Sequence, residues 1–273
     1  MPDSVLLIDK AEGPTSHDLV AEVRRRFGRG VKVGHAGTLD PFANGLLIVL
    51  IGRATRTQRL FMSLNKTYEA TARFGAVSTT GDRDGEITET GVVPVGDLAL
   101  PAGPMMQRPP AFSAVKVGGR RAYDFARAGE EVELAERPIR VESFVETWRS
   151  DDRRGFRIEC SSGTYIRSLV ADLGDAYCEE LRRTAIGPFD VGESSGREPI
   201  ALVDALRRVM PEIPVGPADA DHLAHGRIAS LGEGESGPNP RSEAIATLDG
   251  ELIAVVEVGD DRFLRSVIGF PSD

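Results

Sequence analysis

The sequence predicts an α+β protein in which a large mixed domain is followed by a small β module. Patterns typical of helices and of strands are interspersed through the first 210 residues without a regular βαβ repeat. Pro211, Pro214 and Pro217 indicate a linker, and three strand-like segments joined by tight turns follow it. We therefore expect one domain over residues 1–210 and a separate module over residues 211–273.

The composition is that of an ordinary globular protein. The 273 residues are enough to bury a core, and 41% of them are hydrophobic and 27% charged. No stretch approaches the roughly 20 apolar residues that span a bilayer. The start lacks a basic segment and a cleavage site, so we expect a cytoplasmic protein. Cys160 and Cys178 have no C-x-x-C spacing and no nearby histidine, which favours reduced thiols over a metal site.

The net charge of −9 is unevenly distributed. From residue 211 onward twelve acidic residues face four basic ones, a local charge of −8, which leaves about −1 for the first 210 residues. The basic residues of the large domain cluster at Arg24, Arg25, Arg26, Arg29 and Lys32, at Arg53, Arg56 and Arg59, at Arg108, Lys116, Arg120, Arg121 and Arg127, and at Arg182 and Arg183. A locally basic face can hold phosphates, although charge alone favours ordinary solvated surfaces.

The first half of the large domain has clear local signals. Ser4–Ile8 is a short apolar strand, and Thr15 or Ser16 can cap a helix over residues 17–27 that Gly28 ends. Its apolar residues share one face: Leu19, Val20, Val23 and Phe27. A glycine-rich loop, a buried strand, a short helix and an alternating strand are then expected over residues 31–45, 46–51, 57–63 and 66–74.

The remaining elements are predicted with the same rules. Residues 79–110 contain many turn formers and prolines and are expected to form a loop. Strands are expected over residues 112–117, 137–148 and 155–160, helices over 121–128, 165–173 and 202–209, and a short element over 181–184. In the module we expect a short helix over residues 219–224 and a meander of strands over 244–248, 251–258 and 263–268.

The densest chemical signal is the loop GHAGTLDPFANG at residues 34–45. Its glycines let the backbone approach a ligand closely, and Pro41 biases Asp40 toward an extended conformation. A carboxylate and a histidine in a loop that leads into a buried strand form a candidate active site. The alternative is that Asp40 only makes an Asx turn.

Other segments carry weaker signals. Arg167 lies in the first turn of a helix that follows a glycine turn, where its fork could pair with a carboxylate or simply face solvent. Tyr68 lies on a strand and suits either a core or a base-stacking platform. The phosphate-binding, zinc-protease, serine-hydrolase and dinucleotide motifs are all absent from the sequence.

Taken together, these segments resemble the TruB family, the bacterial tRNA pseudouridine-55 synthases. Five ordered matches at compatible spacing are far more specific than any one motif. They are the loop at 34–45, Lys66–Tyr68, Pro109–Lys116 with Gly118–Tyr123, Gly163–Arg167 with Asp172–Gly174, and Leu181–Thr184. The resemblance implies the pseudouridine synthase fold, with a mixed, mainly antiparallel sheet flanked by helices and loops, and a small PUA-like C-terminal module.

The resemblance also implies a role for each matched residue. Asp40 would act on the target nucleotide, by attack at C1′ or by removal of the C2′ proton, and Arg167 would pair with it. Tyr68 would stack on the flipped base, and Leu181 would line the pocket. His35 would fill the space that the base leaves in the RNA loop. Further substrate-binding positions implied by the motifs are Gly37, Lys66 and Lys116.

The expected partner is the T stem-loop of tRNA, with uridine 55 as the target. No cofactor, metal, membrane or guide RNA is expected, and the chain is expected to be a monomer. Two alternatives remain open: a synthase that acts on another RNA, and a catalytically silent RNA-binding or RNA-folding protein. A glycoside hydrolase would need a second carboxylate beside Asp40, for which Asp9, Asp18 and Asp172 are candidates without a supporting motif.

The sequence departs from the family pattern at four places. Ala11 stands where proline is usual, and Phe112 replaces a tyrosine. The stretches over residues 91–107 and 174–181 are shorter than the family pattern, and the second lacks a G-x-G-A-H segment. Because both correspond to mobile RNA-binding segments in the family, we hypothesise that loop residues are missing from the sequence there, rather than deleted from the protein.

Overall fold

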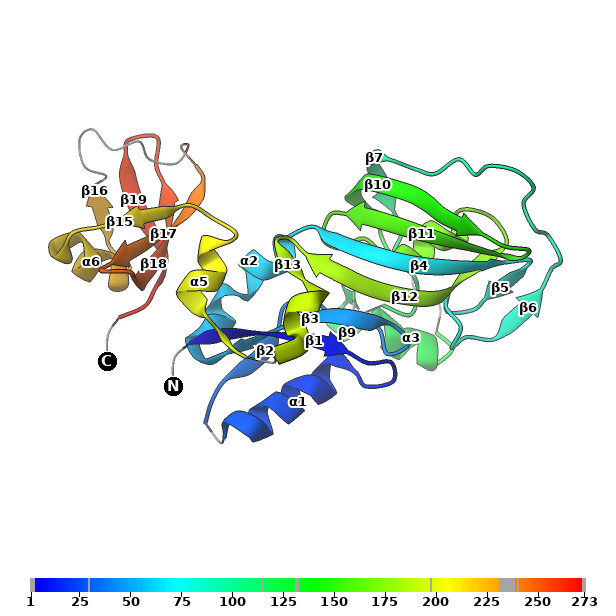
Figure 1. Cartoon of the computed structure of the whole chain (residues 1–273), viewed down its shortest axis with the longest axis horizontal. Helices are drawn as coiled ribbons and strands as arrows, with labels where there is room; N and C mark the ends of the chain where they lie inside the picture. Colours follow the sequence, from blue (N-terminus) through cyan, green and yellow to red (C-terminus); the bar gives the residue numbers. More distant parts are fainter. Residues whose placement is uncertain are drawn as a thin grey trace.

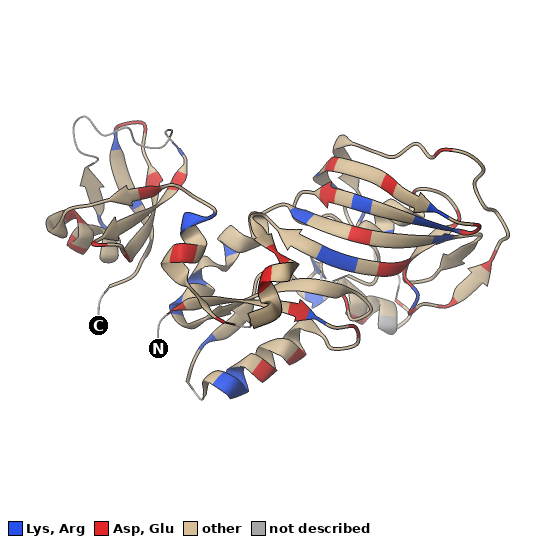
Figure 2. Cartoon of the chain, in the orientation of Figure 1, with Lys and Arg blue, Asp and Glu red and all other residues tan. Residues whose placement is uncertain are grey.

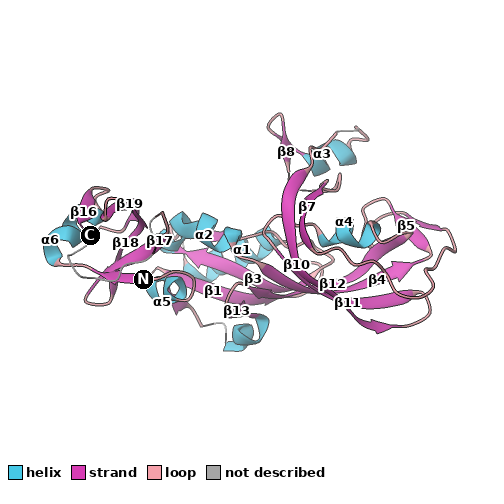
Figure 3. Ribbon diagram, turned by 90° about the horizontal axis from the view of Figure 1, so that it is seen from above, coloured by secondary structure: helices cyan, strands magenta, loops and turns pink. Residues whose placement is uncertain are grey.

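The structure, a computed structural model, describes residues 3–28, 30–113, 115–130, 133–196, 198–230, 239 and 241–271. A large sheet and a small C-terminal β module lie at opposite ends of an elongated molecule, with α2 and α5 between them (Figure 1). Ribbon views from the front and from above agree on this arrangement (Figures 1 and 3). In the described part of the chain, no helix is long and apolar enough to cross a membrane.

The large sheet is mixed and mainly antiparallel, as predicted. Its order is β14-β1-β3-β12-β4-β11-β10-β7, with β2 paired to β3 and β13 to β12. Only the β3–β12 pair is parallel among the strands described in this sheet. The strands are β1 (Ser4–Lys10), β2 (Val33–His35), β3 (Asn44–Ile51), β4 (Lys66–Phe74), β7 (Gly103–Gln107), β10 (Arg137–Arg149), β11 (Arg153–Cys160), β12 (Ala176–Ile186), β13 (Phe189–Asp190) and β14 (Ile200–Ala201).

Strands β1 and β3 are buried on both faces, because alternate residues of each enter different cores. On one face α1 (Ser16–Phe27) packs its apolar stripe, and Thr15 and Asp18 form a capping box at its start. On the other face lie α2 (Gln58–Ser63), α5 (Leu202–Arg207) and part of the C-terminal module. This double burial explains why β3 reads as a continuous apolar run.

The other half of the sheet has one covered and one open face. Inward residues of β4, β10, β11 and β12 form a core with α4 (Ile166–Ala171). Outward positions such as Glu69 and Arg157 are exposed, and Lys, Arg, Asp and Glu alternate over this face (Figure 2). Smaller elements complete the domain: η1 (Gly52–Thr57), β5 (Ala76–Ser78), β6 (Ile87–Glu89), β8 (Lys116–Val117), β9 (Arg120–Arg121), α3 (Ala122–Arg127) and η2 (Val191–Gly196).

The C-terminal module is a five-stranded sheet of order β15-β17-β18-β19-β16, counted over the described residues. Its elements are β15 (Glu212–Pro214), α6 (Pro217–Ala224), β16 (Ile228–Ser230), β17 (Glu243–Leu248), β18 (Glu251–Val258) and β19 (Phe263–Gly269). The prediction of three strands was therefore incomplete, since the expected linker contains β15. The module is packed against the large domain. It contributes Ile245, Val255 and Ile268 to the core that β1 and β3 form with α2 and α5.

The prediction of a loop at residues 79–110 was wrong in part, because β6 and β7 lie within it. The expected loop at residues 31–45 likewise contains β2. The strand expected at 112–117 is reduced to β8; Ala114 lies outside the described residues. The carbonyls of Phe112 and Ser113 are used by Arg167 and by the amide of Tyr123 instead of by a sheet.

The long strand β12 replaces the short element expected at residues 181–184. Register shifts at 178/180 and 183/185 break its period-two pattern and hide it from sequence. It also overturns the hypothesis of missing loop residues. The full sequence contains no further residues between 174 and 181, and the chain passes from α4 through Gly174 directly into β12. The shortening is a property of this protein.

Phe61 and Met62 test the packing of α2. Phe61 is fully buried and contacts the ring of Phe189, whereas Met62 is 44% exposed. We expect Phe61→Ala to lower the free energy of unfolding by about 3–5 kcal/mol through loss of buried area and a residual cavity. Met62→Ala should change it by less than about 0.5 kcal/mol. Urea unfolding measures both, and similar losses would contradict the described burial of α2.

Candidate active site

The loop at residues 36–43 connects β2 to β3. Buried polar groups fix its backbone by hydrogen bonds. The Ser16 Oγ accepts from the Leu39 amide at 3.0 Å and donates to the Leu39 carbonyl at 3.2 Å. The buried Lys10 Nζ donates to the Pro41 carbonyl at 3.2 Å, and the Gly13 amide donates to the same oxygen. The capped start of α1 and the end of β1 thus fix the backbone on both sides of Asp40.

Arg183, on β12, supports the loop from the other side. Its buried guanidinium donates to the carbonyls of Gly37, Thr38 and Leu46 at 3.2, 3.3 and 2.7 Å. Gly45 makes this approach possible, because its φ is +106° and a Cβ there would lie 2.3 Å from the Arg183 carbonyl oxygen. The close contact of β3 with β12 therefore shapes the loop.

Arg167 links Asp40 to a second carboxylate. In the first turn of α4, its Nε lies 3.0 Å from the Asp40 Oδ2 and its Nη1 lies 3.1 Å from the Asp82 Oδ2. It also donates to the carbonyls of Thr80 and Phe112, each at 2.8 Å. Its side chain is only 4% exposed. A guanidinium this buried needs such partners, so its position and that of both carboxylates are mutually fixed.

Opposing effects act on the pKa of Asp40. Burial raises it, the charge and hydrogen bond of Arg167 lower it, and the nearby Asp82 raises it; the net direction is upward. Arg167 therefore offsets only part of the desolvation of this carboxylate. Perturbed carboxylates in clefts are frequent at catalytic centres.

A cavity of about 590 Å³ opens on one side of the Asp40–Arg167 pair. Tyr68 from β4 and Leu181 from β12 line it, each mostly buried, together with Gly37. Burial raises the pKa of Tyr68, which keeps the phenol protonated near neutral pH, while the charge of Arg183 opposes this. The cavity thus combines an aromatic wall with one carboxylate.

Lys66 also lines this cavity, but its ammonium group is turned to the protein. It donates to the carbonyls of Met62 and Leu64 at the end of α2. Burial, aided by the charge of Arg183, lowers the pKa of Lys66 to about 8. Lys66 thereby joins α2 to β4 at the cavity wall.

A second cavity, of about 690 Å³, lies on the other side of Asp40. His35 and Lys116 line it, together with His17, whose ring meets that of His35 edge-on at 5.3 Å. Burial and the neighbouring His17 lower the pKa of His35, so its ring is neutral at physiological pH. The structure therefore divides the predicted site residues between two adjoining cavities, with Asp40 and Arg167 on both.

Two site residues were missed by sequence reasoning. Asp82 lies in the turn-like segment GDRDG at residues 81–85, within the stretch expected to form a loop, and Arg183 belongs to a basic cluster and to the Leu181–Thr184 match, neither of which assigned it a role in the site. A weak signal for Asp82 existed in the two closely spaced carboxylates of that turn. The expected pair of Arg167 and Asp40 is present, but nothing in the sequence shows that the guanidinium is shared.

Comparisons with known proteins show which family the chain resembles. The profile described as TruB family pseudouridylate synthase (N terminal domain) matches residues 24–166. The chain is 40% identical to tRNA pseudouridine synthase B of Thermobifida fusca (strain YX), over 94% of this chain and 95% of that one. It is also 40% identical to the protein of that name from Mycobacterium sp. (strain KMS), over 98% and 96%.

Solved structures resemble the fold at lower identity. The chain superimposes on one in the crystal structure of a Cbf5-Nop10-Gar1 complex with a TM-score of 0.69 and 23% identity, covering 98% of this chain and 85% of that one. A chain in an H/ACA RNP bound to a substrate RNA containing 2′-deoxyuridine gives the same TM-score at 21% identity, with the same coverage. The mixed sheet with few helices and the curled C-terminal sheet, which fits a PUA-like module, are consistent with this likeness. On the profile match and the near full-length identity, the chain belongs to the TruB family of pseudouridylate synthases.

Proposed function

We propose that this protein converts uridine to pseudouridine in the T loop of tRNA, at position 55, with Asp40 as the catalytic residue. The observation that carries the proposal is the Asp40–Arg167 ion pair at 3.0 Å, placed between two cavities in a loop held from both sides. The relatives named tRNA pseudouridine synthase B support tRNA as the substrate.

The reaction is an isomerisation and its atoms balance within the nucleotide. The bond between N1 and C1′ breaks, the uracil turns, and C5 bonds to C1′; C5 then loses its proton and N1 gains one. Asp40 either attacks C1′ or removes the C2′ proton, and both routes require an ionised carboxylate. No redox step, hydrolysis or cofactor enters this balance.

The cavity lined by Tyr68 suits the flipped base, because an aromatic ring offers a stacking surface and Leu181 an apolar wall. Gly37 and Lys66 belong to the same wall. His35 and Lys116 line the second cavity, where the RNA loop that has released its base would lie. Extruding the nucleotide is necessary because Asp40 lies in a recess that a stacked base does not enter.

We further propose that the large domain and the C-terminal module divide near residue 211, and that the protein acts in the cytoplasm as a monomer without guide RNA. The charge distribution supports a limited role for the module in RNA binding. Acidic residues dominate it, so it contributes shape and support more than phosphate binding.

Asp40→Asn tests the catalytic assignment, because it removes the charge and retains the shape. We expect the parent to release tritium from unmodified tRNA labelled at uracil C5, and the variant to lose at least about 10³-fold in rate while still binding tRNA. Asp151→Asn, in the exposed turn between β10 and β11, serves as the control and should release tritium at the parental rate. Activity retained in Asp40→Asn would mean that another residue carries the chemistry.

The pH dependence of the single-turnover rate tests the electrostatics. Because burial raises the pKa of Asp40, the ionised form is lost at a higher pH than for an exposed aspartate, and the rate should fall from there as the pH is lowered. Asp82→Asn removes a charge that raises this pKa, so the acid limb should move to lower pH. Arg167→Met removes the opposing charge and should move the limb upward. If the acid limb of the pH–rate profile stayed in place in both variants, Asp40 would be excluded as the titrating group.

A further inference from the structure

The segment from η1 through α2 contains a series of exposed residues at a spacing of three, although Gln58 and Ser63 are exposed as well. Arg53, Arg56 and Arg59 are exposed and Met62 continues the line, whereas Ala54, Thr57 and Leu60 are buried. In a 3₁₀-helix, residues three apart lie directly above one another, about 6 Å apart along the axis. Arg53 and Arg56 of η1 are therefore stacked, and Arg59 follows in α2, where residues three apart are offset by about 60° around the helix. We refer to this series as the arginine ridge, Arg53–Arg59.

The arginine ridge joins the active site to the C-terminal module. Arg59, Met62 and Ser63 line the cavity that holds Tyr68 and Asp40. At the other end, Arg53 and Arg56 donate to the carbonyls of Pro271 and Gly269, at 2.7 and 2.6 Å, and each guanidinium lies near the ring of Phe270. Viewed from above, α2 lies between the module and the part of the sheet that carries α4 (Figure 3).

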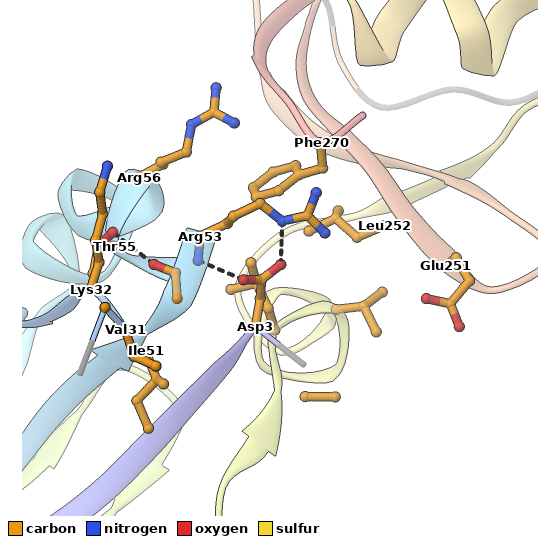
Figure 4. A pocket seen from close by; sticks show the side chains of 15 residues that line it. Asp3, Val31, Lys32, Ile51, Arg53, Thr55, Arg56, Glu251, Leu252 and Phe270 are labelled. Atoms are coloured by element: carbon orange, nitrogen blue, oxygen red, sulfur yellow. Dashed lines mark hydrogen bonds and ion pairs between the residues drawn. The ribbon is translucent and has the colours of Figure 1, made fainter. Parts of the chain in front are cut away.

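A further cavity, of about 630 Å³, lies where the ridge meets the module. Lys32, Arg53 and Arg56 line one side, and Leu252 and Phe270 of the module line another (Figure 4). In this view Lys32 and Arg56 extend toward the same side of the cavity.

The charges around this cavity are only partly neutralised. Asp3 pairs with Arg53 at 2.6 Å, and Glu243 pairs with Arg59. No carboxylate of the described residues lies within ion-pair distance of Lys32 or Arg56, and both side chains are exposed. In a protein of net charge −9, Lys32 and Arg56 thus line one cavity without an ion-pair partner among the described residues, although Glu251 lines the same cavity.

We propose that Lys32 and the arginine ridge bind the sugar-phosphate backbone of the substrate RNA beyond the reacting loop, with Lys32 and Arg56 as the phosphate ligands. This inference rests on the proposed function and specifies where the rest of the RNA lies. Two exposed cations that line one cavity, at the end of a ridge that reaches the catalytic cavity, fit the phosphates of an RNA strand better than a single small anion. The continuity of the ridge with the catalytic cavity sets the direction of the RNA, from Asp40 toward the C-terminal module.

The experiment compares binding of unmodified tRNA transcript and of a hairpin that contains only the T loop and a short stem, at several salt concentrations. For Lys32→Gln with Arg56→Gln we expect about tenfold weaker tRNA binding near 0.1 M salt, and a slope of log K against log salt that is shallower by roughly 1.4–1.8. The hairpin should be weakened less than tRNA, because under this proposal the cations meet the strand beyond the T loop.

Two controls separate charge from structure. Arg157→Gln removes an exposed cation from the outer face of β11 and should leave both the affinity and the salt slope at the parental values. Lys32→Gln alone should give about half the change in slope, and it disturbs no hydrogen bond of the described residues, whereas Arg56→Gln also removes the bond to Gly269.

The outcomes distinguish the two proposals. Parental affinity and salt slope in the double variant, or an equal loss in Arg157→Gln, would overturn the phosphate assignment while the catalytic proposal stands. An inactive parent whose tRNA binding still depends on Lys32 and Arg56 would retain the phosphate assignment and overturn the catalytic one.

Discussion

The buried guanidinium of Arg167 is the group on which the candidate active site depends. A charge removed from water is tolerated only when it is paired and fully hydrogen-bonded. Arg167 meets this condition with Asp40, Asp82 and two backbone carbonyls, which come from segments far apart in the chain. Removing any one of them leaves a buried charge short of a partner. The same network that holds Asp40 in place therefore also orders the turn at Asp82 and the start of α4.

The double burial of β1 and β3 provides the frame for this network. One face packs on α1, whose capped start holds the loop that carries Asp40 through Ser16, and the other packs on α2, α5 and the module. Residues from β17, β18 and β19 belong to that second core, so the module has a defined orientation relative to the active site. The arginine ridge lies along this junction. In the proposed complex, the RNA would follow it from Asp40 toward the module.

Local patterns indicated much of this architecture. The helix at α1, the run of β3 and the alternation of β4 follow directly from periodicity, and the family resemblance brought Asp40, Tyr68 and Arg167 into one site. Elements without a regular hydrophobic period were not predicted from the sequence. Strand β12 has two register shifts, and β15 and β16 are three residues each. Short or irregular strands are stabilised by their neighbours, and a neighbour cannot be seen in a local window.

The sequence by itself determined which groups are available: a glycine-rich loop with one carboxylate, an arginine after a glycine turn, and three arginines at a spacing of three. Only the tertiary structure decided that Arg167 serves two carboxylates, that Arg183 braces the loop, and that Lys32 and Arg56 keep their charge unneutralised beside the module. The physical reason is that ion pairing and desolvation depend on distances of a few ångströms between side chains remote in sequence, which sheet register and core packing set.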